Sequence, residues 1–399
     1  MTMDKMTLKD VDVDGKKVLM RVDFNVPIEN GKIGDDNRIV QALPSINHVT
    51  EHGGKLILMS HLGRPGGEVD ESLSLRPVAE HLQTLVDTNV HFAEDCIGEK
   101  AESVIEQAED GEIVLLENVR FHAGEKANDD DFCKQLAAHG DLFCNDAFGS
   151  SHRAHSSVAG VTRYLQPAVS GFLLEKEIKY LSGSVNNPKR PFVAILGGAK
   201  VSDKIGVIEN LLDKVDTIII GGGMTYTFYK AKRLPIGDSL VEDDKVELAT
   251  KLMEKAEEKG VNFVLPVDSV AAKEFKNDAE HKVVDEDGIE DGWMGVDIGP
   301  QSAISFGNII KNAKTVVWNG PMGVFEMENF ADGTNAVAEA LAEATKHGAT
   351  TIIGGGDSAS AIKQAGLEDA VSHVSTGGGA SLMFLEGGDL PGVVSLTDK

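Results

Sequence analysis

Short apolar segments, separated by polar or glycine-rich stretches, recur along the whole chain of 399 residues. Most of the intervening stretches carry apolar residues at helical spacing. Apolar runs of strand length that alternate with amphipathic helices are typical of βαβ units, whose strands form a parallel sheet. In the first half of the chain the pattern predicts strands at residues 18–24, 55–60, 112–117 and 142–145. In the second half it predicts strands at residues 192–196, 217–220, 262–265, 315–318 and 351–353.

The middle of the chain predicts a boundary between two domains. Residues 171–182 have apolar residues on one side of a helix, and residues 183–188 follow as a predicted loop with glycine, asparagine and proline. A chain of this length is too large for one ordinary hydrophobic core. The sequence therefore predicts two α/β domains that meet near residue 171, to within about ten residues.

The overall charge limits the partners that the protein can have. With 38 Lys plus Arg against 64 Asp plus Glu, the formal net charge is −26. Such a chain is repelled by nucleic acid and by anionic membranes, because both are polyanions. We therefore expect neither as a partner, and any anion that binds must find a local basic pocket.

The cysteines and the N-terminal sequence indicate a reducing compartment. Cys96, Cys133 and Cys144 are odd in number and have no close spacing, which suits neither a disulfide framework nor a cysteine-based zinc site. Residues 1–10 carry charges and no apolar stretch, and no run approaches the roughly 20 residues of a membrane span. The sequence predicts a cytoplasmic protein.

Basic residues cluster in the first half, where seven of the nine arginines and nine of the twelve histidines precede residue 164. Several follow predicted strands directly: His61, Arg64, Arg120, Arg153 and His155. Parallel strands bring their carboxyl ends to one edge of a sheet, and arginine suits bidentate contacts with carboxylate and phosphate. We predict a site for a ligand with more than one negative group. Single arginines could instead pair with surface acids, and the His-x-x-His spacing of residues 152–155 lacks a further metal ligand.

Other polar residues extend this predicted anion site. Asp23 and Asn25 fall on one face of the first predicted strand, where they can accept hydrogen bonds from hydroxyl groups. Arg38 follows the acidic loop at residues 34–37.

In the second half, the strand ends are rich in glycine instead, at residues 197–198, 221–223, 320–323, 354–356 and 377–379. Glycine allows backbone N–H groups to approach a phosphate, and a following helix N-terminus adds partial positive charge. The sequence contains neither a P-loop nor a dinucleotide-binding glycine fingerprint. Lys200 and Lys204 share a predicted helix face near a transferring phosphate, and Asp357 is a candidate ligand for magnesium.

Six motifs follow one another along the chain, at residues 21–27 (RVDFNVP), 61–65 (HLGRP), 197–204 (GGAKVSDK), 318–326 (WNGPMGVFE), 354–357 (GGGD) and 375–381 (STGGGAS). Through these motifs the chain resembles the phosphoglycerate kinase family from near its start to its end. It implies an α/β fold of two Rossmann-like, doubly wound parallel-sheet domains joined by a helical hinge. Residues 1–170, with a returning segment at about 386–399, would bind the phosphoglycerate. Residues 171–385, beginning with the hinge helix, would bind the nucleotide.

The resemblance also implies the reaction and its site. ATP and 3-phosphoglycerate would be interconverted with ADP and 1,3-bisphosphoglycerate, with Mg²⁺, in glycolysis and gluconeogenesis, by a monomer. The implied substrate-binding residues are Arg21, Asp23, Phe24, Asn25, Arg38, His61, Leu62, Gly63, Arg64, Arg120, His152, Arg153 and His155. The implied nucleotide-binding residues are Gly198, Ala199, Lys200, Lys204, Gly221, Gly222, Leu240, Gly295, Asn319, Pro321, Val324, Glu326, Gly354, Gly355, Gly356, Asp357 and Ser358. The implied catalytic residues are Arg38, Lys200, Lys204, Gly355 and Gly378, and Asp357 is the implied metal ligand.

One position departs from the family pattern, since Ser358 stands where many relatives have threonine. Three other functions remain compatible with the residues alone. They are a kinase that acts on another carboxylic acid, such as acetate, a dehydrogenase with two dinucleotide domains, and a nucleotide-binding scaffold without activity. The missing glycine fingerprint disfavours the dehydrogenase. Lys200, Lys204, Arg38 and Asp357 together disfavour the scaffold.

Overall fold

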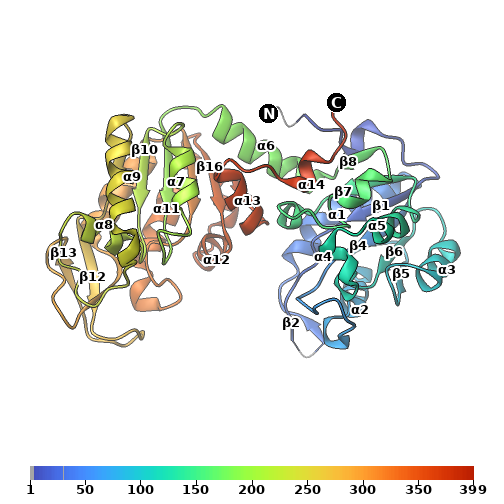
Figure 1. The fold of residues 1–399 in the computed structure, drawn as a ribbon, viewed down its shortest axis with the longest axis horizontal. Coiled ribbons are helices and arrows are strands. Elements are labelled where there is room, and N and C mark those ends of the chain that lie inside the picture. The colour runs from blue at the N-terminus through green and yellow to red at the C-terminus, as the bar shows by residue number, and fades with distance from the viewer. Residues whose placement is uncertain (1–3, 30) are drawn as a thin grey trace. The chain divides into compact units, whose positions relative to one another are not determined.

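The computed structural model describes residues 4–29 and 31–399 (Figure 1). The chain divides into two compact units, which we treat separately. Unit 1 comprises the chain up to Lys179 together with Asp389–Lys399, and unit 2 comprises Tyr180–Gly388. Helix α6 (Phe172–Asn186) contains the boundary. No helix in the described part of the chain is long and apolar enough to cross a membrane.

Unit 1 is built on a six-stranded parallel sheet. Its strands are β1 (Lys17–Arg21), β4 (Lys55–Met59), β5 (Val90–Ala93), β6 (Ile113–Leu116), β7 (Leu142–Asn145) and β8 (Ala168–Ser170). Their order across the sheet is β5-β6-β4-β1-β7-β8, so the chain fills the sheet in both directions from β1. The central strands are buried almost throughout, which parallel strands require when helices cover both faces.

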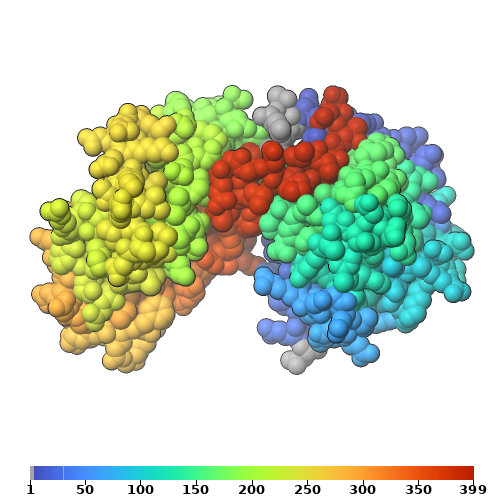
Figure 2. Space-filling view, in the orientation of Figure 1, coloured from blue at the N-terminus to red at the C-terminus, as the bar shows by residue number. Residues whose placement is uncertain are grey.

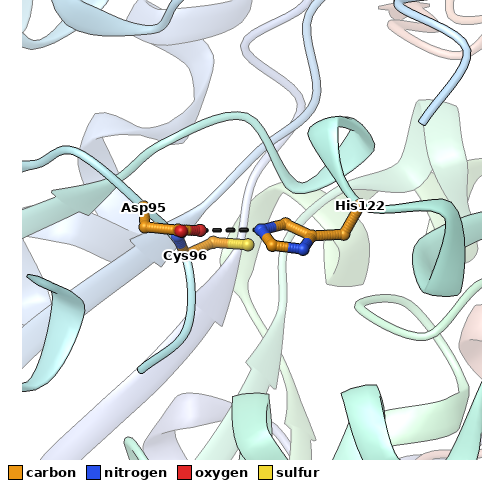
Figure 3. A group of neighbouring side chains, drawn as sticks. All are labelled: Asp95, Cys96 and His122. Atoms are coloured by element: carbon orange, nitrogen blue, oxygen red, sulfur yellow. Dashed lines mark hydrogen bonds and ion pairs between the residues drawn. The ribbon is translucent and has the colours of Figure 1, made fainter. Parts of the chain in front are cut away.

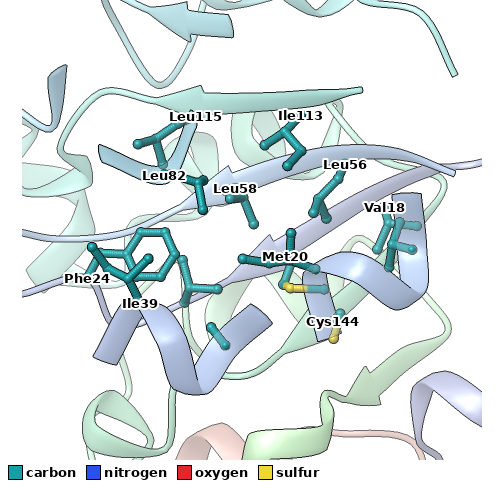
Figure 4. Packing of buried hydrophobic residues seen from close by; sticks show 14 of the residues in the cluster. Val18, Met20, Phe24, Ile39, Leu56, Leu58, Leu82, Ile113, Leu115 and Cys144 are labelled. Carbon is teal, nitrogen blue, oxygen red and sulfur yellow. The ribbon is translucent and has the colours of Figure 1, made fainter. Parts of the chain in front are cut away.

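Helices cover this sheet and close the core of unit 1. They are α1 (Asn37–Glu51), α2 (Arg76–Gln83), α3 (Glu99–Gln107), α4 (Ala123–Ala127), α5 (Asp130–Ala137) and α14 (Pro391–Val394). Helix α1 buries Ile39, Ala42, Ile46 and Val49, whose spacing of three and four residues forms one apolar face. That face packs on aliphatic side chains of β1, β4 and β6, as Figure 4 shows. A two-stranded hairpin of β2 (Ile28–Glu29) and β3 (Lys32–Ile33) precedes α1.

Unit 2 repeats this plan with a second six-stranded parallel sheet. Its strands are β9 (Phe192–Leu196), β10 (Thr217–Ile220), β11 (Asn262–Val264), β15 (Thr315–Asn319), β16 (Thr350–Gly354) and β17 (His373–Val374). The order is β11-β10-β9-β15-β16-β17. A separate antiparallel sheet contains β12 (Asp268–Ala272), β13 (His281–Asp285) and β14 (Met294–Ile298), in the order β13-β12-β14.

The helices of unit 2 are α7 (Ile205–Leu211), α8 (Thr225–Ala231), α9 (Val246–Glu258), α10 (Pro300–Asn312), α11 (Asp332–Lys346), α12 (Gly356–Gln364) and α13 (Gly378–Leu385). Helices α10, α11 and α12 contribute to the core cluster that contains the fully buried Trp318. Short 3-10 turns complete the fold at η1 (Leu8–Asp10), η2 (Glu71–Leu73), η3 (Val119–Phe121), η4 (Phe148–Ser150), η5 (Gly160–Arg163), η6 (Asp243–Lys245), η7 (Glu328–Phe330) and η8 (Glu368–Ala370).

The α/β fold class with two doubly wound parallel sheets is confirmed, and each predicted strand coincides with an observed one. The pattern did not predict β5, β8 and β17, the outer strands of the two parallel sheets, and three further details were wrong or missed. The first strand ends at Arg21 rather than residue 24, so Asp23 and Asn25 lie in a loop. Helix α6 continues through residues 183–186, which were predicted as loop. The antiparallel sheet escaped prediction because β13 alternates between exposed and half-buried residues and lacks an apolar run.

The C-terminal segment completes unit 1. The backbone N–H of Met6 donates to the carbonyl of Thr397 at 2.9 Å, and Lys5 pairs with Asp398 at 2.7 Å. Residues 4–6 and 397–399 therefore lie side by side (Figure 2). Deeper in the unit, Asn145 donates to the carbonyl of Gly392 at 2.8 Å. This contact ties the returning segment to the end of β7.

Helix α6 begins on a buried carboxylate. Asp146 is fully buried directly after β7, and its Oδ1 accepts the backbone N–H of Leu174 at 3.0 Å. Its Oδ2 has no hydrogen-bond partner among the described residues. Gly171 makes this approach possible, because a Cβ there would lie 2.3 Å from Oδ1 of Asp146. Burial raises the pKa of Asp146 from 3.8 to about 7, although hydrogen bonds from Ser45 and the α6 backbone act in the opposite direction.

This raised pKa predicts a pH dependence of stability. Between pH 3.8 and about 7 the folded chain holds a proton on Asp146 that the unfolded chain has lost, so this carboxyl lowers the stability as pH rises through that window. Asp146→Asn keeps the acceptor for Leu174 but cannot ionise. Between about pH 5 and pH 8, we expect the melting temperature of the variant to fall by several degrees less than that of the wild type. Thermal unfolding followed by circular dichroism measures this.

Asp129→Asn is the matched control. Asp129 also caps a helix, accepting the N–H of Phe132 at 2.9 Å, but it is exposed. The control should follow the wild-type pH profile. An Asp146→Asn profile parallel to the wild type would contradict the prediction.

Candidate active site

Each parallel sheet has one place where the chain turns from filling one side to filling the other. In unit 1 it lies between β1 and β7, and in unit 2 between β9 and β15. Loops after such neighbouring strands run in opposite directions and leave a crevice at the carboxyl edge, where ligands of open α/β sheets bind. Most of the predicted site residues follow strands of these two parallel sheets.

In unit 1, Arg21 ends β1 with its side chain almost completely buried. Its Nε donates to the hydroxyl of Ser157 at 2.8 Å, and its Nη1 donates to the carbonyl of Val22. Its Nη2 lies 3.0 Å from Nδ1 of His61. Since a guanidinium only donates, His61 accepts at Nδ1.

His61 is buried in the loop after β4 and is neutral. Burial lowers its pKa well below 6.5, and the positive charges of Arg21, Arg120, Arg153 and Arg38 lower it further. The four arginines are therefore close enough to act on one imidazole. The structure brings these predicted residues together into what we call the basic cluster: Arg21, Arg38, His61, Arg120, His152, Arg153 and His155.

Arg120 contributes donors that the protein itself does not use. It lies in η3, and its Nη1 donates to the carbonyl of Gly63 at 2.7 Å. Its Nε is buried without a partner among the described residues. Burial, followed by Arg153 and Arg21, lowers the pKa of Arg120 to about 10, so it remains charged at neutral pH. A buried donor without a partner is costly, and an anion bound here would relieve that cost.

The remaining members of the basic cluster, His152, Arg153 and His155, follow β7. Arg153 donates from Nε to Nε2 of His152 at 3.0 Å. Burial, followed by the charges of Arg120 and Arg153, lowers the pKa of His155 to about 4, so its ring is neutral near pH 7. Nδ1 of His155 lies 3.7 Å from the buried carboxylate of Glu125, which accepts the N–H and hydroxyl of Ser157 at 2.9 and 2.7 Å.

Arg38 lies at the start of α1 and faces the loop after β1. Its Nη1 lies 3.4 Å from Oδ1 of Asp23 and donates to the carbonyl of Asn25 at 3.0 Å. Oδ1 of Asn25 in turn accepts the N–H of Gly63 at 2.9 Å. These contacts align the loop after β1 with the loop after β4.

The cluster carries a surplus of positive charge. Arg21, Arg38, Arg120 and Arg153 supply four positive charges, while Asp23 and Glu125 supply two negative charges, so two positive charges remain. The histidines add none at neutral pH, because their pKa values are lowered. In a protein of net charge −26, this local surplus of positive charge suits a dianion or a more highly charged ligand.

Three other predicted residues differ in their surroundings. Phe24 and Leu62 are buried in the core of unit 1, so only their backbone can face a ligand. Arg64 is exposed and makes no hydrogen bond or ion pair within residues 4–29 and 31–399. Glu125 and Ser157 hold the buried Arg21 in place but were not predicted. No periodic or motif signal in the sequence marks them.

In unit 2, glycines allow the strand-end loops to cross very closely. A Cβ on Gly197 would lie 2.1 Å from the carbonyl oxygen of Pro321, and one on Gly222 would lie 2.6 Å from the N of Gly198. Gly320 has φ +102°, and its Cβ would lie 2.2 Å from the carbonyl oxygen of Gly197. No other residue fits these crossings without a shift of backbone.

The amides of these crossing loops already have partners. The N–H groups of Gly198, Gly221 and Gly222 donate to the carbonyls of Pro321, Leu196 and Met322 at 3.1, 2.9 and 2.8 Å. They therefore shape the edge of the sheet, and a phosphate would have to take its amide donors from elsewhere.

Helices α12 and α13 offer such donors. An α-helix leaves its first N–H groups without internal partners, and neither helix has a side-chain cap. Gly355 precedes α12 with φ +93°, and a Cβ on Gly378 would lie 3.1 Å from the N of Gly356. The two N-termini are therefore adjacent, and both direct partial positive charge to the same place.

Lys204 and Asn319 lie beside these helix ends. Lys204 donates from Nζ to Oδ1 of Asn319, whose Nδ2 is buried without a partner in the described part of the chain. Burial lowers the pKa of Lys204, while Asp203 and Asp357 raise it, so Asp357 lies close enough to act on this lysine. Lys200 is exposed in the loop after β9.

The other predicted nucleotide residues are of three kinds. Ser358 is buried, and its hydroxyl accepts the N–H of Gly320 at 2.6 Å, so it ties α12 to the loop after β15. Gly295 lies against Tyr226, whose hydroxyl would be 1.9 Å from an added Cβ. Half-exposed or exposed positions are Ala199, Leu240, Val324 and Glu326. Of these, the apolar Leu240 is 51% exposed and lies beside Gly223.

One unit thus offers surplus positive charge, and the other offers paired helix N-termini with a lysine. That combination is typical of a kinase, an enzyme that transfers a phosphoryl group to a small acceptor. Comparison with known proteins agrees. The family model described as phosphoglycerate kinase matches residues 8–388. The chain belongs to the phosphoglycerate kinase family.

Individual relatives extend over the whole chain. It is 57% identical to phosphoglycerate kinase from Chlorobium phaeobacteroides over 397 residues, which are 99% of this chain and 100% of the relative. The relative from Chloroherpeton thalassium is also 57% identical, over 396 residues, with the same coverage. The solved structure of phosphoglycerate kinase from Coxiella burnetii has a TM-score of 0.89 at 42% identity, covering 98% of each chain. That from Pyrococcus horikoshii has a TM-score of 0.84 at 33% identity, with the same coverage.

Proposed function

We propose that unit 1 holds 3-phosphoglycerate at the basic cluster while unit 2 holds ATP at the ends of α12 and α13. The protein is a phosphotransferase with a carboxyl group as acceptor. It transfers a phosphoryl group reversibly between ATP and 3-phosphoglycerate, giving ADP and 1,3-bisphosphoglycerate, in glycolysis. The observation that carries the assignment of sites is the surplus of two positive charges in the basic cluster.

The charge of 3-phosphoglycerate matches this surplus. Its phosphate carries about −1.5 to −2 and its carboxylate −1 at neutral pH. Arg120 has a buried Nε without a partner and Arg153 adjoins it, so these two suit the phosphate. Asp23 and Asn25 supply oxygens that can accept a hydrogen bond from the substrate hydroxyl.

For the nucleotide, the uncapped N-termini of α12 and α13 suit the phosphate chain. Lys204 adds a positive charge beside them, and Lys200 can reach the same place from the exposed loop after β9. Apolar contacts for the base would come from Leu240 and Val324, beside Gly221, Gly222 and Gly295. The carboxylate of Glu326 suits a ribose hydroxyl.

The residues near α12 also fit a magnesium ion. Asp357 is exposed in the first turn of α12, and a single carboxylate together with substrate phosphates is the usual protein contribution to a Mg²⁺ site. Bound there, Mg²⁺ would neutralise phosphate charge. Asp357 would supply the carboxylate that holds the ion.

The chemistry needs positioning and neutralisation more than proton transfer. The acceptor carboxylate is already ionised and nucleophilic, so no general base is required. The transferring phosphoryl group spreads negative charge over its oxygens, and Arg38 and Lys204 can stabilise that charge. Asp23 and the carbonyl of Asn25 hold Arg38 at the edge of the basic cluster.

Transfer also requires donor and acceptor to meet away from water, which would otherwise hydrolyse the acyl phosphate. We therefore propose hinge motion about residues 171–190, which include α6. The radius of gyration from small-angle X-ray scattering should decrease when both 3-phosphoglycerate and a non-hydrolysable ATP analogue are present. Identical scattering from free and doubly liganded protein would argue against closure.

The family resemblance further supports a monomer in the cytoplasm, without nucleic acid or membrane as partner. Sedimentation equilibrium should give a mass close to 42.6 kDa.

Turnover can be measured as ADP formation that depends on both 3-phosphoglycerate and Mg²⁺. Arg38→Ala should lower kcat by about 10³-fold, equivalent to roughly 4 kcal/mol, because a charge that stabilises the transferring group is lost. Arg76→Ala is the matched control, since Arg76 is an exposed arginine of unit 1 that pairs with Glu94 at 3.2 Å. The control should retain normal turnover.

Near-normal turnover of Arg38→Ala would contradict its role. Wild-type protein that forms no ADP with 3-phosphoglycerate, yet does so with acetate, would transfer the assignment to another carboxylic acid.

A further inference from the structure

A group of three metal-ligating side chains lies in unit 1 apart from the basic cluster (Figure 3). Asp95 and Cys96 follow β5, and His122 lies between η3 and α4. One ligand atom from each side chain lies within 4.8 Å of the others. We call this group the Asp-Cys-His cluster. The cysteine pattern alone did not predict it, because two of the three ligands are not cysteines and His122 is distant in sequence.

We propose that the Asp-Cys-His cluster binds a zinc ion or a similar soft divalent cation. The proposal rests on geometry. Oδ1 of Asp95 lies 2.7 Å from Nε2 of His122, and Figure 3 shows the sulfur of Cys96 directed toward the same end of the ring. Cys96 is fully buried, and its sulfur forms no hydrogen bond within residues 4–29 and 31–399. Nitrogen, oxygen and thiolate sulfur are the donors that zinc takes.

The ligand atoms need little movement to reach tetrahedral spacing. With zinc bonds of about 2.0 to 2.3 Å, ligand atoms lie roughly 3.2 to 3.8 Å apart. Oδ1 of Asp95 and Nε2 of His122 are slightly closer to each other than this. Side-chain rotations that move these atoms by on the order of 1 Å would make room for the ion. On binding, the metal would replace the thiol proton of Cys96. The ring of His122 would then carry its proton on Nδ1, leaving Nε2 free to bind.

The surrounding contacts already hold the ligands in place. The ring of His122 stacks on Phe132 with centroids 5.3 Å apart and an interplanar angle of 29°. The N–H of Cys96 donates to Oδ1 of Asp95 at 2.7 Å. The carbonyl of Cys96 lies 3.1 Å from Nε2 of His139. In metal sites, contacts of this kind fix the orientation of the residues that bind the metal directly.

Access to the cluster favours an exchangeable ion with a water in the fourth position. Cys96 lies at the base, while the side chains of Asp95 and His122 are 37% and 31% exposed. A thiol ligand disfavours Mg²⁺ and Ca²⁺, which prefer oxygen ligands. Binding here is therefore distinct from that expected at Asp357.

The position of His122 gives metal binding a consequence for the basic cluster. His122 joins η3, which carries Arg120, to α4, which carries Glu125. A metal ion bound at Nε2 of His122 would connect the residues between η3 and α4 to the loop after β5, which carries Asp95 and Cys96. We expect metal binding to change the KM for 3-phosphoglycerate rather than kcat. This expectation rests on the proposed function, whereas the proposal that the cluster binds metal does not.

The test uses the full-length protein, freed of metal by a chelator and titrated with Co²⁺. A thiolate bound to Co²⁺ gives a charge-transfer absorption band in the near ultraviolet that imidazole and carboxylate do not give. We expect one Co²⁺ per chain with this band, and its loss when Zn²⁺ is added. Cys96→Ser should abolish the band, and His122→Gln should weaken Co²⁺ binding at least about tenfold.

Cys133→Ser is the matched control, since Cys133 is another fully buried free cysteine of unit 1 and lies outside the cluster. It should keep the band. Because His122 is partly exposed, His122→Gln tests the site even where Cys96→Ser fails to fold. Absence of the band at excess Co²⁺, or its persistence in Cys96→Ser, would overturn the proposal and reduce the cluster to a hydrogen-bonded pair beside a core cysteine. Both results are independent of turnover.

Discussion

The burial of the Arg21 guanidinium is the constraint on which the basic cluster of unit 1 depends. A buried charge is costly unless partners occupy its donors, and here Ser157, the carbonyl of Val22 and His61 occupy them. His61 can take part only as a neutral acceptor, so its lowered pKa is a condition of the arrangement. The other arginines then add positive charge that Asp23 neutralises only in part.

Glycine serves two purposes in unit 2. At Gly197, Gly222 and Gly320 the missing side chain lets loops cross, and the amides of the crossing loops are used within the protein. At Gly355 and Gly378 it opens the space before two helix N-termini, whose first N–H groups have no internal partners. Glycine thus shapes the edge of the sheet where the loops cross and leaves backbone N–H donors available at the two helix N-termini.

Much of this arrangement could be predicted from the sequence, because apolar runs mark buried strands and the residues after parallel strands share one edge. Arg120, Arg153 and His61 followed from that rule. What escaped prediction depends on packing between distant segments. Glu125 approaches Arg21 and Ser157 only through the fold, and the polar strand β13 pairs with β12 without an apolar run of its own.

The return of the last residues to unit 1 has a consequence for synthesis. A chain emerging from the ribosome presents β1 to β8 first, yet Gly392 and Thr397, which bond to the ends of β7 and the N-terminal segment, emerge last. Unit 2 is a contiguous stretch and can complete itself while attached to the ribosome. The first half of the nascent chain therefore cannot form these contacts until residues 392–397 have been synthesised, after the whole of unit 2.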